Sequence, residues 1–102
     1  MASVVFKHQL LEAVVSTVTS DAVDVKRQIE MTFYFVATGV STGATIVIEA
    51  QDDFGNWIII HTEAIAATGN TFADISGAHS NVRARVSAWT DGTYTVSMNE
   101  QR

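Results

Sequence analysis

The sequence predicts an all-β protein, built as a two-sheet antiparallel β-sandwich of about eight strands, with a barrel as the alternative closure. Apolar and polar residues alternate with a period of two along most segments, as in strands that bury one face. Val, Ile and Thr recur throughout, and these β-branched residues fit a pleated sheet better than a helix. Short turns separate the extended segments, which is typical of sandwiches and barrels.

Length and composition limit what the chain can be. Its 102 residues are expected to form one domain, residues 1–102, and 47% of them are apolar, which is enough for a single core. The sequence has no cysteine, so disulfides, thiolate nucleophiles and thiolate metal ligands are excluded. The net charge of −5 argues against general binding to nucleic acid phosphates.

The N-terminal residues do not have the pattern of a signal peptide. They lack a basic leader, and Lys7 and His8 interrupt the apolar run. No apolar stretch approaches the about 18 residues that a membrane helix needs. We therefore expect no membrane partner, and a protein that stays in the cytoplasm or leaves the cell as part of an assembly.

The first strand is expected at 6–15, with a break near Glu12. A short helix is the alternative for its second half, from Leu10 to Val15. Residues 1–20 are therefore expected to form either an edge segment or an N-terminal arm. A short strand follows at 22–25.

The clearest alternation lies in the strand expected at 29–38. Its inward-facing residues are expected to be Ile29, Met31, Phe33 and Phe35, and its outward-facing residues Glu30, Thr32 and Tyr34. The next strand, at 44–51, alternates Ile46 and Ile48 against Thr45, Val47 and Glu49.

The second half of the chain predicts four more strands, joined by turns. Asp52-Asp53-Phe54-Gly55-Asn56 and Asp91-Gly92 are hairpin signals, because Gly allows a positive φ and Asp and Asn bond to their own backbone. The strands are expected at 57–66, 71–75, 82–89 and 93–99. In the strand at 82–89 the inward-facing residues are expected to be Val82, Ala84, Val86 and Ala88.

One strand departs from the alternation. Trp57-Ile58-Ile59-Ile60 is apolar on both faces, with Trp57 and Ile59 on one side and Val47 of the preceding strand next to them in a suitable register. Either residues 1–15 cover the second face, or a second subunit does. The sequence has no proline to protect its sheet edges, which favours edges that are covered in an assembly.

No pattern in the sequence predicts catalysis, a cofactor or a metal site. His61 and Glu63 share a strand face and offer two metal ligands, but no third ligand is recognisable. Asp52 and Asp53 lack the repeated oxygen ligands of a calcium loop. There is no Gly-x-Ser-x-Gly elbow and no glycine-rich phosphate loop. We expect a protein that is not an enzyme.

Two residue sets have both a binding and a structural interpretation. Arg83 and Arg85 share a strand face, which suits either an anion or ion pairs with neighbouring acids. The aromatic residues either stack on sugar rings or fill the core and an interface; these residues are Tyr34, Trp57, Trp89 and Tyr94.

From Ala22 to Met98 the order of segments resembles a known family. The segments are Val-Asp-Val, an amphipathic aromatic strand, Ala-Thr-Ile-Val-Ile-Glu-Ala, Asp-Asp-Phe-Gly-Asn-Trp, Asn-Val-Arg-Ala-Arg-Val and Trp-Thr-Asp-Gly-Thr-Tyr-Thr-Val. They resemble the capsid cement (decoration) proteins of tailed bacteriophages. The resemblance implies a jelly-roll fold and a homotrimer on the capsid exterior that bridges subunits of the major capsid protein. It implies no chemistry, so no catalytic residue is carried over.

The leading hypothesis is therefore a phage cement protein, made in the host cytoplasm and located on the virion. Its candidate contact residues are Val4, Val5, Phe6, Val47, Trp57 and Ile59. The alternative is a carbohydrate-binding or receptor-binding β-sandwich module of a phage tail or fibre, which requires exposed Trp or Tyr side chains.

Overall fold

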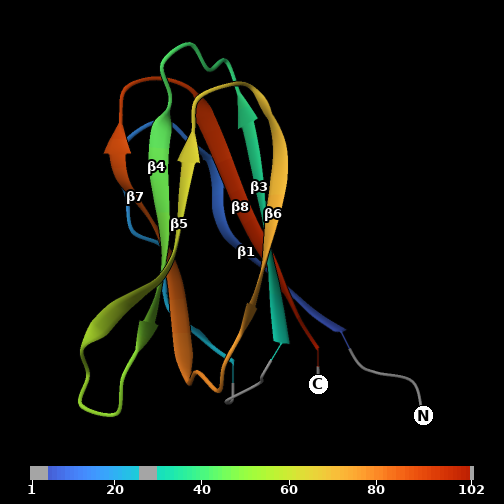
Figure 1. Ribbon diagram of the computed structural model, residues 1–102, viewed down its shortest axis with the longest axis vertical. Coiled ribbons are helices and arrows are strands. Elements are labelled where there is room, and N and C mark those ends of the chain that lie inside the picture. Colours follow the sequence, from blue (N-terminus) through green and yellow to red (C-terminus); the bar gives the residue numbers. More distant parts are fainter. Residues whose placement is uncertain (1–4, 26–29, 102) are drawn as a thin grey trace.

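The computed structural model describes residues 5–25 and 30–101, and within these ranges the chain forms eight strands and no helix (Figure 1). The all-β prediction is confirmed, and no membrane-spanning helix occurs in these ranges. The strands are β1 (Val5–Val14), β2 (Val23–Asp24), β3 (Glu30–Thr38), β4 (Ala44–Gln51), β5 (Trp57–Ile65), β6 (Gly69–Ser76), β7 (Asn81–Trp89) and β8 (Thr93–Gln101).

The strands pair as a long ribbon folded back on itself. The first strand pairs with the last, β2 with β7, β3 with β6 and β4 with β5, all antiparallel. The ribbon then rolls up, so that β3 also pairs with β8 and β4 with β7. The result is two four-stranded sheets, in the orders β1-β8-β3-β6 and β2-β7-β4-β5. This is the strand order of a jelly roll, as predicted.

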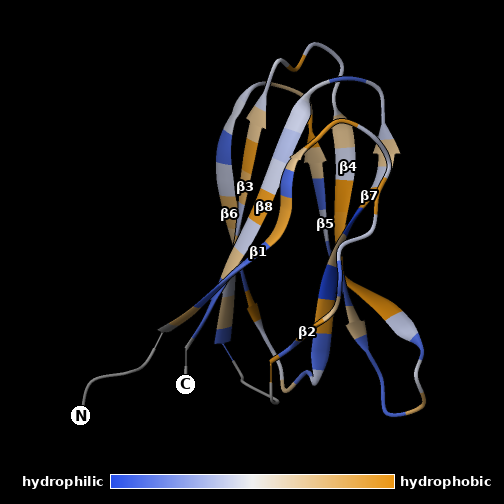
Figure 2. Cartoon of the chain, turned by 180° about the vertical axis from the view of Figure 1, so that it is seen from behind, coloured by the Kyte–Doolittle hydropathy of each residue, from blue (hydrophilic) through white to orange (hydrophobic). Residues whose placement is uncertain are grey.

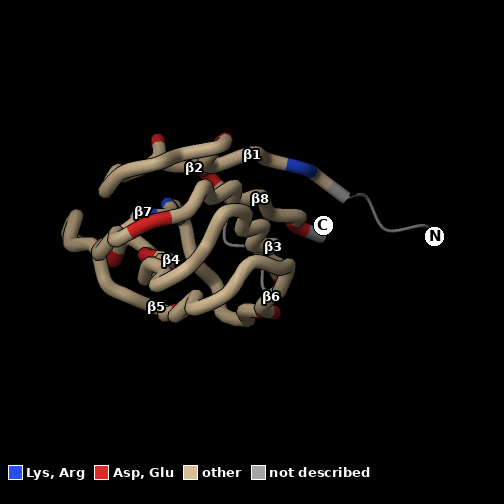
Figure 3. Tube along the Cα trace, turned by 90° about the horizontal axis from the view of Figure 1, so that it is seen from above, with Lys and Arg blue, Asp and Glu red and all other residues tan. Residues whose placement is uncertain are grey.

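The two sheets face each other across one core. Seen from above, β7, β4 and β5 lie on one side and β8, β3 and β6 on the other (Figure 3). Apolar and polar colours alternate along the strands, as expected for sheets that bury one face (Figure 2). The largest fully buried apolar side chains of the core are Phe33, Phe35, Ile46, Ile48, Tyr94 and Met98.

The expected inward and outward faces of β3 are confirmed where they can be seen. Met31, Phe33 and Phe35 are buried, and Tyr34 is exposed. Ile29 lies outside the described residues. In β7 the expectation for Ala88 was wrong, because this side chain is exposed. The register of β4 and β7 shifts between Thr45 and Ile46, so the alternation changes phase before Ala88.

The segment with two interpretations, Leu10 to Val15, is extended through Val14 and not helical. Its pairing with β8 is irregular, with register shifts on both sides of Leu11, and Ala13 has a φ of 48°. Apolar residues on consecutive positions produced the helix-like pattern, because each register shift changes the face that the next side chain occupies.

A carboxylate connects two loops at the upper end of the sandwich. The side chain of Asp91, in the turn between β7 and β8, accepts hydrogen bonds from the backbone N–H groups of Ser41, Thr42 and Gly43 at 2.9–3.2 Å. The bond from Thr42, with those from Gly43 and Ser41, keeps the pKa of Asp91 below its ordinary value despite partial desolvation. The turn is held further by the Tyr94 hydroxyl, which donates to the Asp91 carbonyl at 2.6 Å.

Two phenylalanines on neighbouring strands test which face carries the core. Phe33 is fully buried in β3, whereas Phe72 of β6 is exposed on the outer face. We predict that Phe33→Ala lowers the free energy of unfolding by about 3–5 kcal/mol, because it leaves a cavity. Phe72→Ala, which removes the same atoms from the surface, is expected to cost about 1 kcal/mol or less. Urea denaturation measures both, and equal losses would contradict the assigned faces.

Candidate interaction surface

The outer face of the sheet β7-β4-β5 gathers the residues that the sequence suggested for contacts. Glu49 of β4 lies directly opposite Ile59 of β5 and Arg83 of β7. Val47 lies opposite Thr62 and Arg85. The side chains of β4 on this face are nonetheless buried, since Glu49 is only 5% exposed and Val47 only 3%.

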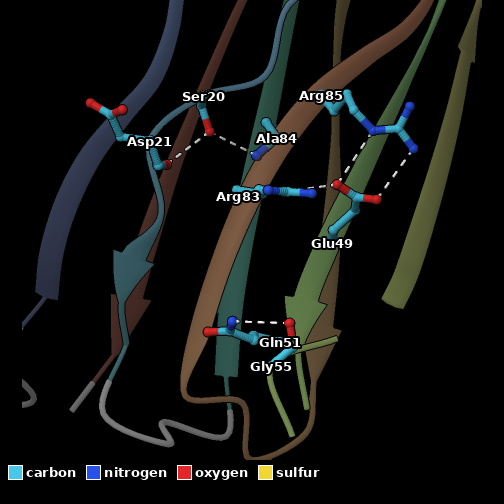
Figure 4. Close-up of polar contacts among 8 residues, drawn as sticks. All are labelled: Ser20, Asp21, Glu49, Gln51, Gly55, Arg83, Ala84 and Arg85. Carbon is cyan, nitrogen blue, oxygen red and sulfur yellow. Dashed lines mark hydrogen bonds and ion pairs between the residues drawn. The ribbon is translucent and has the colours of Figure 1, made fainter. Parts of the chain in front are cut away.

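Glu49 is buried by the two arginines that flank it (Figure 4). The Arg83 Nε donates to Glu49 Oε1 at 2.9 Å. Arg85 donates through Nε to the same oxygen at 3.3 Å and through Nη2 to Oε2 at 3.2 Å. The arginines of β7 therefore form ion pairs within the chain, which is the structural interpretation of their shared face.

The guanidinium of Arg83 also covers Trp57. Its Cζ lies 4.1 Å from the centroid of the Trp57 ring, which is close enough for a cation–π contact. Trp57 is half-buried. The Glu49 cluster, namely Glu49, Arg83, Arg85 and Trp57, forms a fixed polar surface with one more positive than negative charge. It contains no nucleophile.

Burial raises the pKa of Glu49, but hydrogen bonds from Arg85 and Arg83 and their charges outweigh this, so the pKa lies below its ordinary value of 4.5. The sequence placed Glu49, Arg83 and Arg85 on outward faces. The sequence did not show that β4 and β7 are neighbouring strands. This pairing is what brings the three side chains together.

A bulge in β5 separates the upper part of this strand from the lower part. Ile48 pairs with His61 and the next residue, Glu49, pairs with Ile59, so Ile60 is an extra residue. Below the bulge, Ile58 and Ile59 point to opposite faces, yet both remain half exposed, at 52% and 50%. Cover by residues 1–15 is not seen in the described part, because β1 pairs with β8 in the other sheet.

The hairpin that joins β4 and β5 extends away from the body of the sandwich, toward the lower left in Figure 1. We call the segment from Gln51 to Ile59 the β4–β5 arm. In Figure 2 apolar colour continues from the sandwich into one strand of this arm, whereas the turn is mostly hydrophilic. The side chain of Phe54 at its tip is 90% exposed.

The turn at the tip is built around Asp52. Its Oδ1 accepts the backbone N–H groups of Phe54 at 2.8 Å and Asn56 at 2.9 Å, and its Oδ2 accepts the Asn56 side-chain amide at 3.0 Å. These bonds, led by that of the Asn56 side chain, lower the pKa of Asp52. Gly55 supplies a φ of 88°, which favours glycine. The turn therefore holds Phe54 in solvent on a defined backbone.

The candidate contact residues from the sequence do not form one patch. Val4 and the side chain of Val5 lie outside the described residues. Phe6 lies on β1, an edge strand of the other sheet, and is 37% exposed. Trp57 and Ile59 lie together on the arm, as expected from their spacing, whereas Val47 is covered. Phe54 was missed, because in sequence it reads only as one residue of a turn.

The remaining candidate residues have structural partners. His61 Nε2 and Glu63 Oε1 bond to each other at 3.0 Å, and no group of three potential metal ligands occurs in residues 5–25 and 30–101. Tyr94, for which both sugar stacking and a place in the core were considered, is fully buried. The indole N–H of Trp89 donates to the Gly92 carbonyl at 3.0 Å.

Comparisons with known proteins place this jelly-roll sandwich among solved structures. The SPBc2 prophage-derived protein YomS has a TM-score of 0.74 at 18% identity, over 100% of this chain and 96% of YomS. The PBSX exported protein XepA has a TM-score of 0.82 at 12% identity, over 100% of this chain but only 39% of XepA.

A protein from Bacillus endospore appendages, which form disulfide-linked pili, has a TM-score of 0.52 at 13% identity, over 97% of this chain and 83% of that one. No protein-family profile matches the chain, and no curated protein sequence matches it either. Identities this low show a shared fold.

The Glu49 cluster makes a prediction about stability and pH. We expect Glu49→Gln to lower the free energy of unfolding at neutral pH by about 2 kcal/mol, because the charged hydrogen bonds to Arg83 and Arg85 are lost. A depressed pKa stabilises the fold above the unfolded value, near 4.5, and this contribution is lost as the pH falls through the lower folded value.

The difference between Glu49→Gln and the unaltered protein should therefore shrink as the pH falls below 4.5. Guanidinium denaturation across this range measures it. Glu12→Gln, at an exposed position of β1, is the matched control and should change stability by less than about 0.5 kcal/mol. A difference that is independent of pH would contradict the ionic role of Glu49.

Proposed function

We propose that this chain is a structural protein of a tailed-phage virion that works by association and carries out no chemistry. In its specific form the proposal is a capsid cement trimer, seated on the exterior of the head and bridging subunits of the major capsid protein. The observation that carries it is the β4–β5 arm, which presents Phe54, Ile58 and Ile59 to solvent.

The arm has the properties of a protein-binding element. Phe54 is a large aromatic anchor of the kind that dominates binding energy at interfaces. The bonds to Asp52 fix the turn before any partner arrives, which lowers the entropy cost of binding. Edge strand β5 adds two half-exposed isoleucines on opposite faces, so a partner can enclose the arm from both sides.

Strand β5 also offers its backbone. It pairs with β4 on one side and is the last strand of its sheet. Its first half has no charged side chain, whereas isolated soluble proteins commonly protect such edges with charge or proline. A partner strand or loop alongside β5 would satisfy this edge and cover Ile58 and Ile59 together.

The likeness of fold supports a phage origin. Nearly the whole of the prophage-derived protein YomS has this sandwich, so in YomS the fold makes up almost the entire protein. In XepA, an exported protein of PBSX, it makes up a part. The composition also fits a particle that encounters oxidising surroundings, since a chain without cysteine keeps the same covalent state there.

Trimerisation would explain how a small surface attaches firmly. One arm buries too little area for stable attachment alone, because stable interfaces bury about 800 Å² per partner. Three copies held in one trimer engage a symmetric capsid position together, and the second and third contacts form at high effective concentration.

The first test is the mass of the purified protein in solution. We expect sedimentation equilibrium at micromolar concentration to give three times the 11.0 kDa chain mass. A mass of one chain would contradict the trimer. The role of the β4–β5 arm in binding is tested separately, in the second experiment.

The second test is co-sedimentation with the empty heads of the phage that encodes the chain. Phe54→Ser and Ile59→Ser should each reduce the bound fraction at least about tenfold, as expected for interface anchors. Val15→Ser is the matched control for Ile59→Ser, because Val15 is 57% exposed against 50% for Ile59 but lies outside the arm, and it should bind normally. Binding to tails but not heads would contradict the cement role.

A further inference from the structure

The outer face of the other sheet, β8-β3-β6, carries a regular arrangement of side chains. Antiparallel pairing sets nine outward residues in three rows across the three strands. The upper row is Thr95, Val36 and Asn70, the middle row is Ser97, Tyr34 and Phe72, and the lower row is Asn99, Thr32 and Asp74.

The centre of this grid is apolar and aromatic. Tyr34 and Phe72 lie opposite each other with ring centroids 6.5 Å apart and ring planes inclined by 41°. Phe72 is 61% exposed, and Tyr34 and Val36 are each 39% exposed. The pairing of β3 with β6 fixes the backbone positions from which both rings project on the same face.

Hydrogen-bonding groups surround the rings. The Thr32 hydroxyl donates to Asp74 Oδ1 at 2.7 Å, which holds the carboxylate beside the middle row and leaves Oδ2 as an acceptor. Ser97 and Thr95 supply hydroxyls on the β8 side, and Asn70 supplies an amide on the β6 side. Most of these groups are uncharged, and each can donate or accept.

The charges around the grid favour a neutral ligand over an anion. Asp74 lies within it and Glu30, one pair further along β3, is also acidic. In the described part of the chain, lysine and arginine occur on β1 and β7 (Figure 3). Lys7 of β1 lies opposite Asn99 and so extends the lower row by one ammonium group, whereas the arginines of β7 lie on the other sheet. With two carboxylates against one ammonium group, this surface repels a phosphate or an anionic polysaccharide more than it repels a neutral ligand.

We propose that the Tyr34–Phe72 surface binds a neutral hexose unit of a polysaccharide. One face of a pyranose ring presents C–H groups that stack on an aromatic ring, and its rim presents hydroxyls that donate and accept hydrogen bonds. The grid has a matching arrangement, with aromatic rings at its centre for the C–H groups and Asp74, Ser97 and Asn70 around them for the hydroxyls.

The size of the apolar area favours a sugar over a protein. Three partly exposed side chains offer far less than the about 800 Å² that each partner of a stable protein interface buries. A single pyranose ring is about as wide as one or two aromatic side chains. This surface lies on the sheet opposite the β4–β5 arm, so the proposal is independent of the virion role.

The test is a titration of the full-length protein with cellohexaose, maltohexaose and chitohexaose, followed by two-dimensional amide NMR. We expect one of these sugars, at millimolar concentration, to shift backbone amides of β3, β6 and β8 and not those of the β4–β5 arm. The absence of such shifts with all three sugars would overturn the proposal, as would shifts confined to the surroundings of Trp57 or Trp89.

Two variants of Phe72 distinguish ring stacking from simple apolar contact. Phe72→Leu keeps an apolar side chain without a ring and should raise the sugar Kd about tenfold. Phe72→Tyr keeps the ring and should bind as the unaltered protein does. Thermal unfolding confirms that both variants are folded. Equal affinity of Phe72→Leu and the unaltered protein would overturn the stacking role.

Discussion

The nested pairing of the strands is the constraint on which the rest of the structure depends. Because β1 pairs with β8 and β4 with β5, the chain behaves as one ribbon whose fold point is the turn at residues 52–56. Rolling this ribbon places β3 and β4 inside their sheets, where the inward side chains Phe33, Phe35, Ile46 and Ile48 meet. The core holds the two sheets together, and this leaves two outer faces and one free hairpin end to contact other molecules.

The two outer faces differ in their chemistry. On the sheet with β7, β4 and β5, charged groups neutralise one another through Glu49, Arg83 and Arg85, and Arg83 covers Trp57. On the sheet with β8, β3 and β6, Tyr34 and Phe72 remain open to solvent among hydroxyl and amide groups. On the first face the charged groups and Trp57 have partners within the chain and Ile59 stays half exposed, whereas the second presents aromatic side chains that are partly exposed.

Much of the fold could be predicted from the sequence, because successive side chains of a strand point to opposite faces, so apolar and polar residues alternate where one face is buried. Alternation in β3 placed Met31, Phe33 and Phe35 correctly. The prediction for Ala88 was wrong because a register shift between β4 and β7 changes the phase of the alternation. No pattern in the sequence indicated that shift. The helical interpretation of Leu10 to Val15 arose for the same reason.

The surfaces were harder to predict, since they depend on which strands are neighbours. Glu49 lies in an unbroken run of buried residues, 46–50. Its ion-pair partners belong to β7, more than thirty positions later in the chain. Phe72 was not singled out, because it becomes a candidate binding residue only through its position opposite Tyr34 in the β3–β6 pair. Phe54 gained its importance only from the length by which the hairpin extends beyond the core.

The bulge at Ile60 has a consequence for how this protein can diversify. An extra residue at that position absorbs changes of phase, so the strand segment from His61 to Ile65 keeps its packing whatever the tip does. Substitutions at the exposed positions Asp53 and Phe54 can alter the chemistry of the tip, while Gly55, Asn56 and Trp57 keep the turn and its contacts with the sheet. The loop chemistry can therefore vary at these two positions while the pairing of the remaining strand with β4 stays constant.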